Sequence, residues 1–197
     1  MIILGINAYH ADSSAAIFKD GVMIAATEEE RFRRIKHWAG FPTKAVEFCL
    51  REAGITLNEV NHIAIGRDPK AKFMKKLFFF SKHPFHSLNF VKDRLRNSKK
   101  VASIEGELSK ISDIDVATLK SKIHQVEHHR SHLASAFFAS PFNEAAILSI
   151  DGSGDFSTTM LAIGKGTNIE VIDSIDFPHS IGIFYTAFTQ LLGFPHY

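Results

Sequence analysis

Two stretches of this chain repeat one pattern of apolar and polar residues. Residues 3–7 (ILGIN) align with residues 147–151 (ILSID), and residues 13–18 align with 157–162 at the same offset of 144. Each copy predicts a strand, a polar turn, a hairpin with a glycine in its tight turn, and a helix. A unit that occurs twice predicts two α/β lobes, with the turn after each first strand facing the cleft between them.

The other elements follow from apolar periodicity and turn residues. We expect strands over 2–8, 15–19, 22–27, 62–66, 123–127, 145–150, 158–163 and 169–175. We expect helices over 41–54, with Pro42 at the first position, and over 107–120, 128–139 and 179–192. Residues 1–144 would then form the first lobe, and residues 145–197 would begin the second.

Positive charge is concentrated in one segment. The whole chain carries a formal net charge of +2, but residues 67–100 contain eleven Lys or Arg and two Asp, together with six Phe. Such a stretch is typical of a membrane-surface helix or a nucleic-acid patch. It has no base-reading motif, and Pro84 divides it into two short helices. We therefore expect a helical insertion over 67–110, with phenylalanines packed on the body and lysines solvated, and no nucleic-acid partner.

Cysteine content and hydropathy exclude other classes. The one cysteine, Cys49, excludes an internal disulfide framework and a cysteine-based zinc or iron–sulfur site. The N-terminus lacks the pattern of a signal peptide, and no apolar stretch reaches 18 residues. The sequence predicts a cytoplasmic protein with no transmembrane segment.

The duplicated unit resembles the actin, Hsp70 and sugar-kinase superfamily, which has the actin-like or ribonuclease H-like fold. These proteins hold a nucleotide between two lobes and grip its phosphates with the turn after each first strand. Here Asp151-Gly152-Ser153-Gly154 follows a predicted strand, and its glycines would let backbone N–H groups approach phosphate oxygens. We expect Gly152, Ser153 and Gly154 to bind nucleotide; the alternative is an ordinary loop.

A histidine pair and an acid predict a metal site. His128 and His132 lie one turn apart on a predicted helix, so their imidazoles share a face and can bind one ion. Asp151 follows the next strand, where its side chain can point at the helix start. Two imidazoles and a carboxylate with open positions suit iron(II) or zinc. The alternative is that both histidines are surface residues. The small apolar residues that follow predict a buried helix, with His129 structural.

Several motifs together resemble the NodU/CmcH-type O-carbamoyltransferases, which include nodulation-factor, cephamycin and aminoglycoside carbamoyltransferases. The similar segments span almost the whole chain: 5–15 (GINAYHADSSA), 28–37 (EEERFRRIKH), 126–142 (VEHHRSHLASAFFASPF), 145–148, 151–154, 180–185 and 192–194. Each motif is unspecific alone, and their combination is specific.

The resemblance implies an enzyme that uses ATP and carbamoyl phosphate. In such enzymes a C-terminal domain forms carbamoyl-adenylate, and the duplicated-lobe domain transfers the carbamoyl group to a hydroxyl of a small molecule or glycan. A metal, usually iron, is held by the histidine pair and two aspartates and contacts the nucleotide phosphate. His128, His132 and Asp151 match three of these ligands, and no position matches the fourth.

Further candidates line the expected cleft. His10 and Asp12, in the turn after the first strand, are candidates for acceptor binding and general base; the alternative is a polar turn. Lys36 is a candidate for cofactor binding, alongside His37, although a solvated basic turn fits equally. The run 28–30 (EEE) is expected to be a solvated strand end, and Asp155 either supports the metal ligands or is a loop acid.

The chain ends at Tyr197, before the rest of the second lobe and the adenylate-forming domain of the family. We therefore expect an N-terminal portion that does not catalyse transfer alone. Two other classes stay open. One is a nucleotide-binding kinase or chaperone of the actin-like superfamily, which needs no metal-binding histidines. The other is a non-catalytic module that uses residues 67–100 to bind membrane, nucleic acid or a partner.

Overall fold

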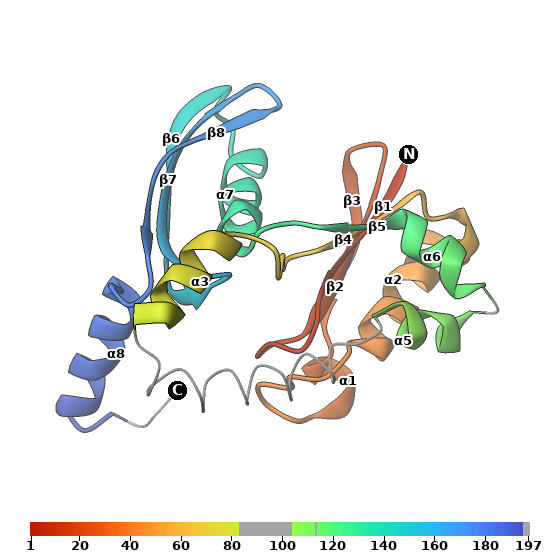
Figure 1. Cartoon of the computed structure of the whole chain (residues 1–197). Helices are drawn as coiled ribbons and strands as arrows, with labels where there is room; N and C mark the ends of the chain where they lie inside the picture. The colour runs from red at the N-terminus through yellow and green to blue at the C-terminus, as the bar shows by residue number, and fades with distance from the viewer. Residues whose placement is uncertain (83–103, 113, 195–197) are drawn as a thin grey trace. The chain divides into compact units, whose positions relative to one another are not determined.

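The computed structural model describes residues 1–82, 104–112 and 114–194, which fold into two compact units (Figure 1). Of the described residues, the first unit comprises 1–66, 80–82, 104–112 and 114–125, and the second comprises 67–79 and 126–194. This division differs from the expected lobe boundary at residue 144, because residues 126–144 belong with the strands that follow them. The described parts of the expected insertion 67–110 are also divided between the units: 67–79 belong to the second, and 80–82 and 104–110 belong to the first.

The first unit is built on a five-stranded sheet. Its strand order is β3-β2-β1-β4-β5, where β1 is Ile2–Asn7, β2 is Ser14–Lys19, β3 is Val22–Glu28, β4 is His62–Ile65 and β5 is Ile123–Gln125. The first three strands are antiparallel, and β4 and β5 run parallel to β1. Asp20 and Gly21 both have positive φ (53° and 85°), as the expected tight hairpin requires.

Helices α2 (Thr43–Ala53), α5 (Ile104–Ile111) and α6 (Val116–Lys122) and the 3₁₀ turn η1 (Leu57–Glu59) cover one face of this sheet, whereas the short helix α1 (Glu30–Arg33) follows the end of β3 and has no buried residue. The core between sheet and helices is apolar, and its fully buried side chains include Leu4, Ile17, Val46, Ile63, Leu108 and Leu119. Pro42 precedes α2 as its N-cap residue and so lies one position earlier than expected.

One expected helix is two helices. The prediction of a single helix over 107–120 was wrong, because α5 ends at Ile111 and α6 begins at Val116. Asp115 starts the second helix: its carboxylate accepts hydrogen bonds from the backbone N–H groups of Ala117 and Thr118. Aspartate is a favourable N-cap, so the chain can restart a helix there.

The N-terminus of α2 is capped by a buried acid. Glu29 is fully buried, accepts a hydrogen bond from the Ala45 backbone N–H at 2.8 Å, and pairs with Arg33 Nε at 2.7 Å. The expectation that residues 28–30 are a solvated strand end is therefore wrong for Glu29. Its carboxylate satisfies an orphan N–H of the first helical turn and lies at the positive end of the helix dipole.

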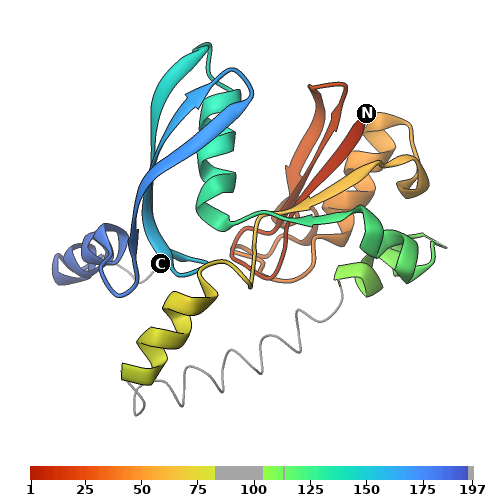
Figure 2. The same cartoon turned by 45° about the horizontal axis from the view of Figure 1, so that its top comes forward.

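The second unit is a three-stranded antiparallel sheet with helices (Figure 2). Its strands are β6 (Glu144–Gly154), β7 (Ser157–Lys165) and β8 (Asn168–Asp176), and its helices are α7 (His128–Phe138) and α8 (Ile181–Leu191). Leu133 and Phe137 of α7 are buried against Ile147 and Met160 of the sheet. Only this face of α7 is buried, so the expectation of a buried helix holds for one face.

Helix α3 (Phe73–Lys82) begins in the basic segment, and its first turns belong to the second unit. Lys72 and Lys75 both pair with Asp176 at the end of β8, and the Phe79 ring packs edge-on against Phe177 at 5.4 Å. Phe73 and Phe78 are more than half exposed and Lys76 is buried. The expected pattern of packed phenylalanines and solvated lysines is thus reversed at three positions.

Part of the basic segment lies outside the described residues, including the expected break at Pro84. Across the part of the chain that the structure describes, no helix is long and apolar enough to cross a bilayer.

Candidate metal centre

The candidate metal centre lies in the second unit, where α7 begins. Two carboxylates bind the first turn of α7. Glu127 accepts a hydrogen bond from the Arg130 N–H at 2.9 Å, and Asp155 accepts one from the His128 N–H at 3.0 Å. Asp155 also accepts from the Asp68 N–H at 2.7 Å. These bonds satisfy N–H groups that a helix leaves unpaired, and they fix the backbone that carries His128.

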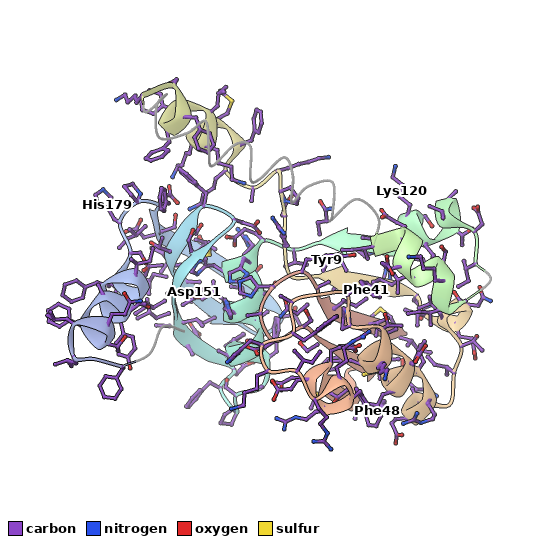
Figure 3. The ribbon with its side chains drawn as sticks, turned by 90° about the horizontal axis from the view of Figure 1, so that it is seen from below. Tyr9, Phe41, Phe48, Lys120, Asp151 and His179 are labelled. Carbon is purple, nitrogen blue, oxygen red and sulfur yellow. The ribbon has the colours of Figure 1, made fainter. Side chains whose placement is uncertain are left out.

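The two histidines and Asp151 converge on one point. His128 Nε2 lies 2.8 Å from Asp151 Oδ2 and 3.0 Å from His132 Nε2, and His132 Nε2 lies 3.9 Å from the same carboxylate oxygen. A triangle with these sides has a point about 2 Å from every corner, which matches the usual lengths of bonds from zinc or iron to nitrogen and oxygen. The three donors therefore fit one divalent ion. Figure 3 shows Asp151 in this unit.

An irregular stretch of β6 presents Asp151 to the histidines. The pairing of β6 with β7 is regular up to Ile150 and shifts before Gly154 pairs with Ser157. The expectation of a turn at 151–154 was therefore wrong in part: these residues end the strand, and the turn itself is Asp155-Phe156, both with positive φ. Such an irregularity is a common way to redirect a side chain.

Gly154 makes room for the imidazole of His128. A Cβ built at Gly154 would lie 1.9 Å from His128 Cδ2, whereas a Cβ at Gly152 would meet nothing within 4 Å. Gly182, at the start of α8, is needed for a similar reason, because its Cβ would lie 2.5 Å from the backbone of Asp151. Ser180 caps α8 and donates a hydrogen bond to the Gly152 carbonyl at 2.7 Å.

Hydrogen bonding keeps Asp151 ionised. The His128 imidazole strongly lowers the pKa of the Asp151 carboxyl; burial opposes this shift, and the Gly152 N–H, 2.6 Å away, adds to it. His128 is 18% exposed and His132 is 51% exposed, so the centre is open on the His132 side. An ionised carboxylate beside two imidazoles is the protonation state that metal ligands require.

His129 points away from this centre. It is fully buried, and its Nδ1 lies 2.8 Å from Ser149 Oγ on β6. Burial lowers the pKa of His129, which favours the neutral imidazole. Its burial and its hydrogen bond to Ser149 fit the structural role that the sequence predicts for His129.

The other predicted site residues lie in the first unit. Asp12 Oδ1 is 3.0 Å from His37 Nδ1, and both residues have positive φ (61° and 54°). His10 and Lys36 are exposed in the same two turns, which are tied together by buried Ser13 through hydrogen bonds to the carbonyls of His10 and Gly40. The structure thus brings Asp12 and His37 into contact.

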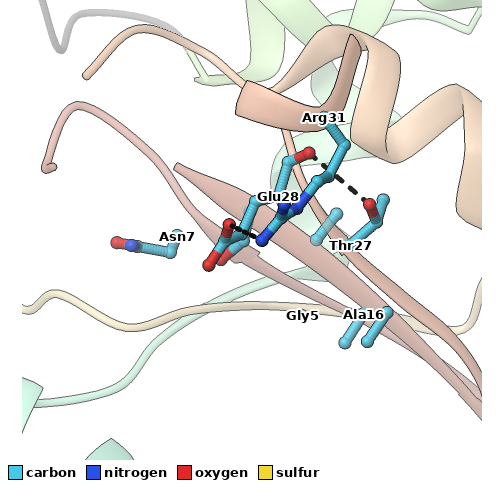
Figure 4. Close-up of a pocket in the computed structure, with 9 residues that line it drawn as sticks. Gly5, Asn7, Ala16, Thr27, Glu28 and Arg31 are labelled. Carbon is cyan, nitrogen blue, oxygen red and sulfur yellow. Dashed lines mark hydrogen bonds and ion pairs between the residues drawn. The ribbon is translucent and has the colours of Figure 1, made fainter. Parts of the chain in front are cut away.

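An open pocket of about 520 Å³ lies on the sheet face opposite the helices of this unit (Figure 4). Its floor is made of small residues in register on three strands, because Gly5 pairs with Ala16 and Ala16 pairs with Ala26. Polar side chains line the rest: Asn7, Ser14, Thr27, Glu28 and Arg31. The Asn7 amide donates to the Asp12 carbonyl at 3.3 Å, so the pocket adjoins the candidate turn. We did not predict this pocket, although alternating small residues were its sequence signal.

Comparisons with known proteins identify the family. The sequence profile described as the carbamoyltransferase N-terminus matches residues 2–196. The uncharacterized protein sll1178 of Synechocystis is 42% identical over 98% of this chain, which covers 32% of that relative. Nodulation protein NolNO of Sinorhizobium fredii is 31% identical over 95% of this chain, which covers 26% of that relative.

Among solved structures, YeaZ from Pseudomonas aeruginosa is similar with a TM-score of 0.46 and 14% identity, covering 90% of this chain and 67% of that one. The chain spans about a third or less of the length of the curated relatives given above. Because the profile matches almost every residue, as the sequence motifs predicted, the chain belongs to the carbamoyltransferase N-terminus family.

Proposed function

We propose that this chain is the metal-bearing, N-terminal part of an ATP-dependent O-carbamoyltransferase. The reaction would move a carbamoyl group from carbamoyl phosphate, through carbamoyl-adenylate, to a hydroxyl of a small molecule or glycan. The convergence of His128, His132 and Asp151 carries this proposal, because a nucleotide-binding kinase or chaperone needs no such donor set. We also propose the actin-like arrangement of duplicated lobes as the architecture of the whole domain.

The metal centre would act on the phosphate side of the reaction. A divalent ion bound there, with iron(II) favoured and zinc possible, supplies a Lewis acid that stabilises negative charge on the departing phosphate. His128, His132 and Asp151 hold the ion, and Asp155 positions His128 through its backbone N–H. The backbone of 152–154, with the start of α8 beside it, would face the nucleotide phosphates.

The turn at residues 9–13 would act on the acceptor side. The acceptor oxygen attacks the carbamoyl carbon, the bond from that carbon to the adenylate oxygen breaks, and AMP leaves. Asp12 would take the hydroxyl proton, with His37 holding its carboxylate in place, while His10 binds the acceptor. Lys36 would contact the anionic cofactor. The pocket beside Asn7 has the size and polar lining to hold the acceptor.

The test uses the complete polypeptide that contains this chain. It is supplied with ATP, labelled carbamoyl phosphate and a panel of aminoglycoside and oligosaccharide acceptors. We expect labelled carbamoyl-adenylate and labelled acceptor, and we expect His128→Ala/His132→Ala to lower transfer by about 100-fold or more while adenylate formation continues. His179→Ala, an exposed histidine outside the centre, is the control. Undiminished transfer in the double variant would refute the proposal.

A further inference from the structure

A second pair of histidines lies on the sheet of the first unit. His62 is the first residue of β4 and His124 is the middle residue of β5, and the parallel pairing sets Ala64 opposite His124. Alternate residues of a strand share a face, so His62 lies on the same face as Ala64 and His124. Ile63, which lies between His62 and Ala64 in the sequence, is buried under the helices, whereas His62 and His124 are exposed.

The two imidazoles meet nitrogen to nitrogen. His62 Nδ1 lies 2.9 Å from His124 Nε2, and the ring centroids are 4.9 Å apart. In the candidate metal centre, His128 Nε2 and His132 Nε2 are 3.0 Å apart and their centroids are 4.6 Å apart. The exposed pair therefore has almost the same donor spacing. That spacing is the one that two ligands have when they occupy neighbouring positions on one ion, each about 2.0–2.1 Å from it.

We propose that His62 and His124 bind one divalent transition-metal ion, with zinc as the probe, at a site separate from the candidate metal centre. The ligand atoms are Nδ1 of His62 and Nε2 of His124, and water completes the coordination. Two neutral imidazoles suit zinc, copper or nickel rather than magnesium or calcium, which prefer oxygen ligands. No carboxylate within the described residues completes a three-ligand group there, so the site is weaker than one with three protein ligands.

The position of the pair indicates what the ion does. β5 has three residues, lies at the edge of the sheet and pairs with β4 over three positions. An ion held by one histidine from each strand joins them directly. Because the ion binds the folded sheet more tightly than the unfolded chain, the stability of the first unit rises with the logarithm of the ion concentration once that concentration exceeds the Kd.

The ligand atoms are tested by NMR of the full 197-residue chain labelled with ¹⁵N-histidine. The chain carries His128→Ala/His132→Ala, so that the candidate metal centre does not contribute. On addition of Zn²⁺ we expect the resonances of His62 Nδ1 and His124 Nε2 to move to the range of zinc-bound imidazole. If both keep the values of a metal-free pair, in which one neutral imidazole donates a hydrogen bond to the other, the proposal is wrong.

Stability provides an independent readout. In the same double-variant background, Zn²⁺ should raise the Tm, and adding His124→Asn should abolish that rise while leaving the metal-free Tm within a few degrees. His179→Ala, an exposed histidine in the second unit, should leave the rise intact. A rise that persists with His124→Asn would overturn the assignment, and circular dichroism confirms that each variant is folded.

Discussion

At the scale of single residues, two neighbours of the candidate metal centre hold His128 in place: Gly154, and Asp155, which the sequence left open as a support for the metal ligands or a loop acid. Helical spacing alone places His128 and His132 on one face, and the strand before Asp151 brings that acid near. Asp155 and Gly154 act through a backbone N–H and an excluded Cβ. Such contacts depend on the three-dimensional path of the chain, which no spacing rule describes.

Gly154→Ala tests whether that glycine positions the centre. The new methyl group would overlap the His128 ring, so we expect metal affinity to fall by about 10- to 100-fold, the range for residues that orient metal ligands. Gly152→Ala is the matched control, because its Cβ enters open space. Isothermal titration with Zn²⁺ measures both variants in a His124→Asn background, so that zinc binding at His62 and His124 does not contribute. Equal affinities in the two variants would show that zinc binding does not depend on the space that Gly154 leaves for the His128 ring.

At the scale of elements, strands and hairpins followed their sequence signals most closely. The Asp20-Gly21 hairpin, β4, β7 and β8 lie within a residue or two of expectation, since alternation and turn residues act locally. The prediction of one helix over 107–120 was wrong because the choice between one helix and two depended on an N-cap at Asp115. The prediction for Glu29 was wrong because this charged residue at a strand end is buried by helix α2, whose Ala45 N–H lies sixteen residues further along the chain.

Glu29→Gln tests the cap of α2. The substitution keeps the shape but leaves Arg33 without its partner and weakens the bond to the Ala45 N–H. We expect a loss of about 2–4 kcal/mol in the free energy of unfolding, measured by urea denaturation. Glu47→Gln, on the exposed side of α2, should change it by less than about 0.5 kcal/mol. Similar losses in both variants would contradict the buried cap.

Asp176 links α3 to β8 and should make the second unit sensitive to acid. Burial acts to raise the pKa of Asp176, but hydrogen bonds and charge from Lys72 and Lys75 outweigh it, and the pKa is lowered. A lowered folded-state pKa gives stability that is present above the unfolded-state value, near 4, and is lost as the pH falls through the folded-state value.

Asp176→Asn should therefore destabilise the second unit by about 1–2 kcal/mol at pH 7 and flatten the loss of stability below pH 4. Thermal unfolding from pH 2.5 to 7 measures this, with Glu170→Gln, an exposed acid on the same strand, as the control. If Asp176→Asn loses stability below pH 4 as steeply as the unchanged chain does, the contacts of Asp176 with the two lysines do not hold α3.

At the scale of the whole molecule, the duplication predicted two sheets and misplaced their boundary. Helix α7 follows the last strand of the first sheet along the chain but buries Leu133 and Phe137 against the second sheet. The apolar spacing predicts the helix but does not say which of the two sheets it packs on. This choice has a consequence for function: both histidines and Asp151 belong to one compact unit, and the centre needs no contact between units.

The most direct test of the account is anomalous diffraction from crystals of this chain grown with Zn²⁺ or, without oxygen, with Fe²⁺. We predict a peak about 2.0–2.2 Å from His128 Nε2, His132 Nε2 and an oxygen of Asp151, absent in crystals of His128→Ala/His132→Ala. Crystals that contain the metal and show no peak between these three side chains would contradict the metal centre and the function proposed from it.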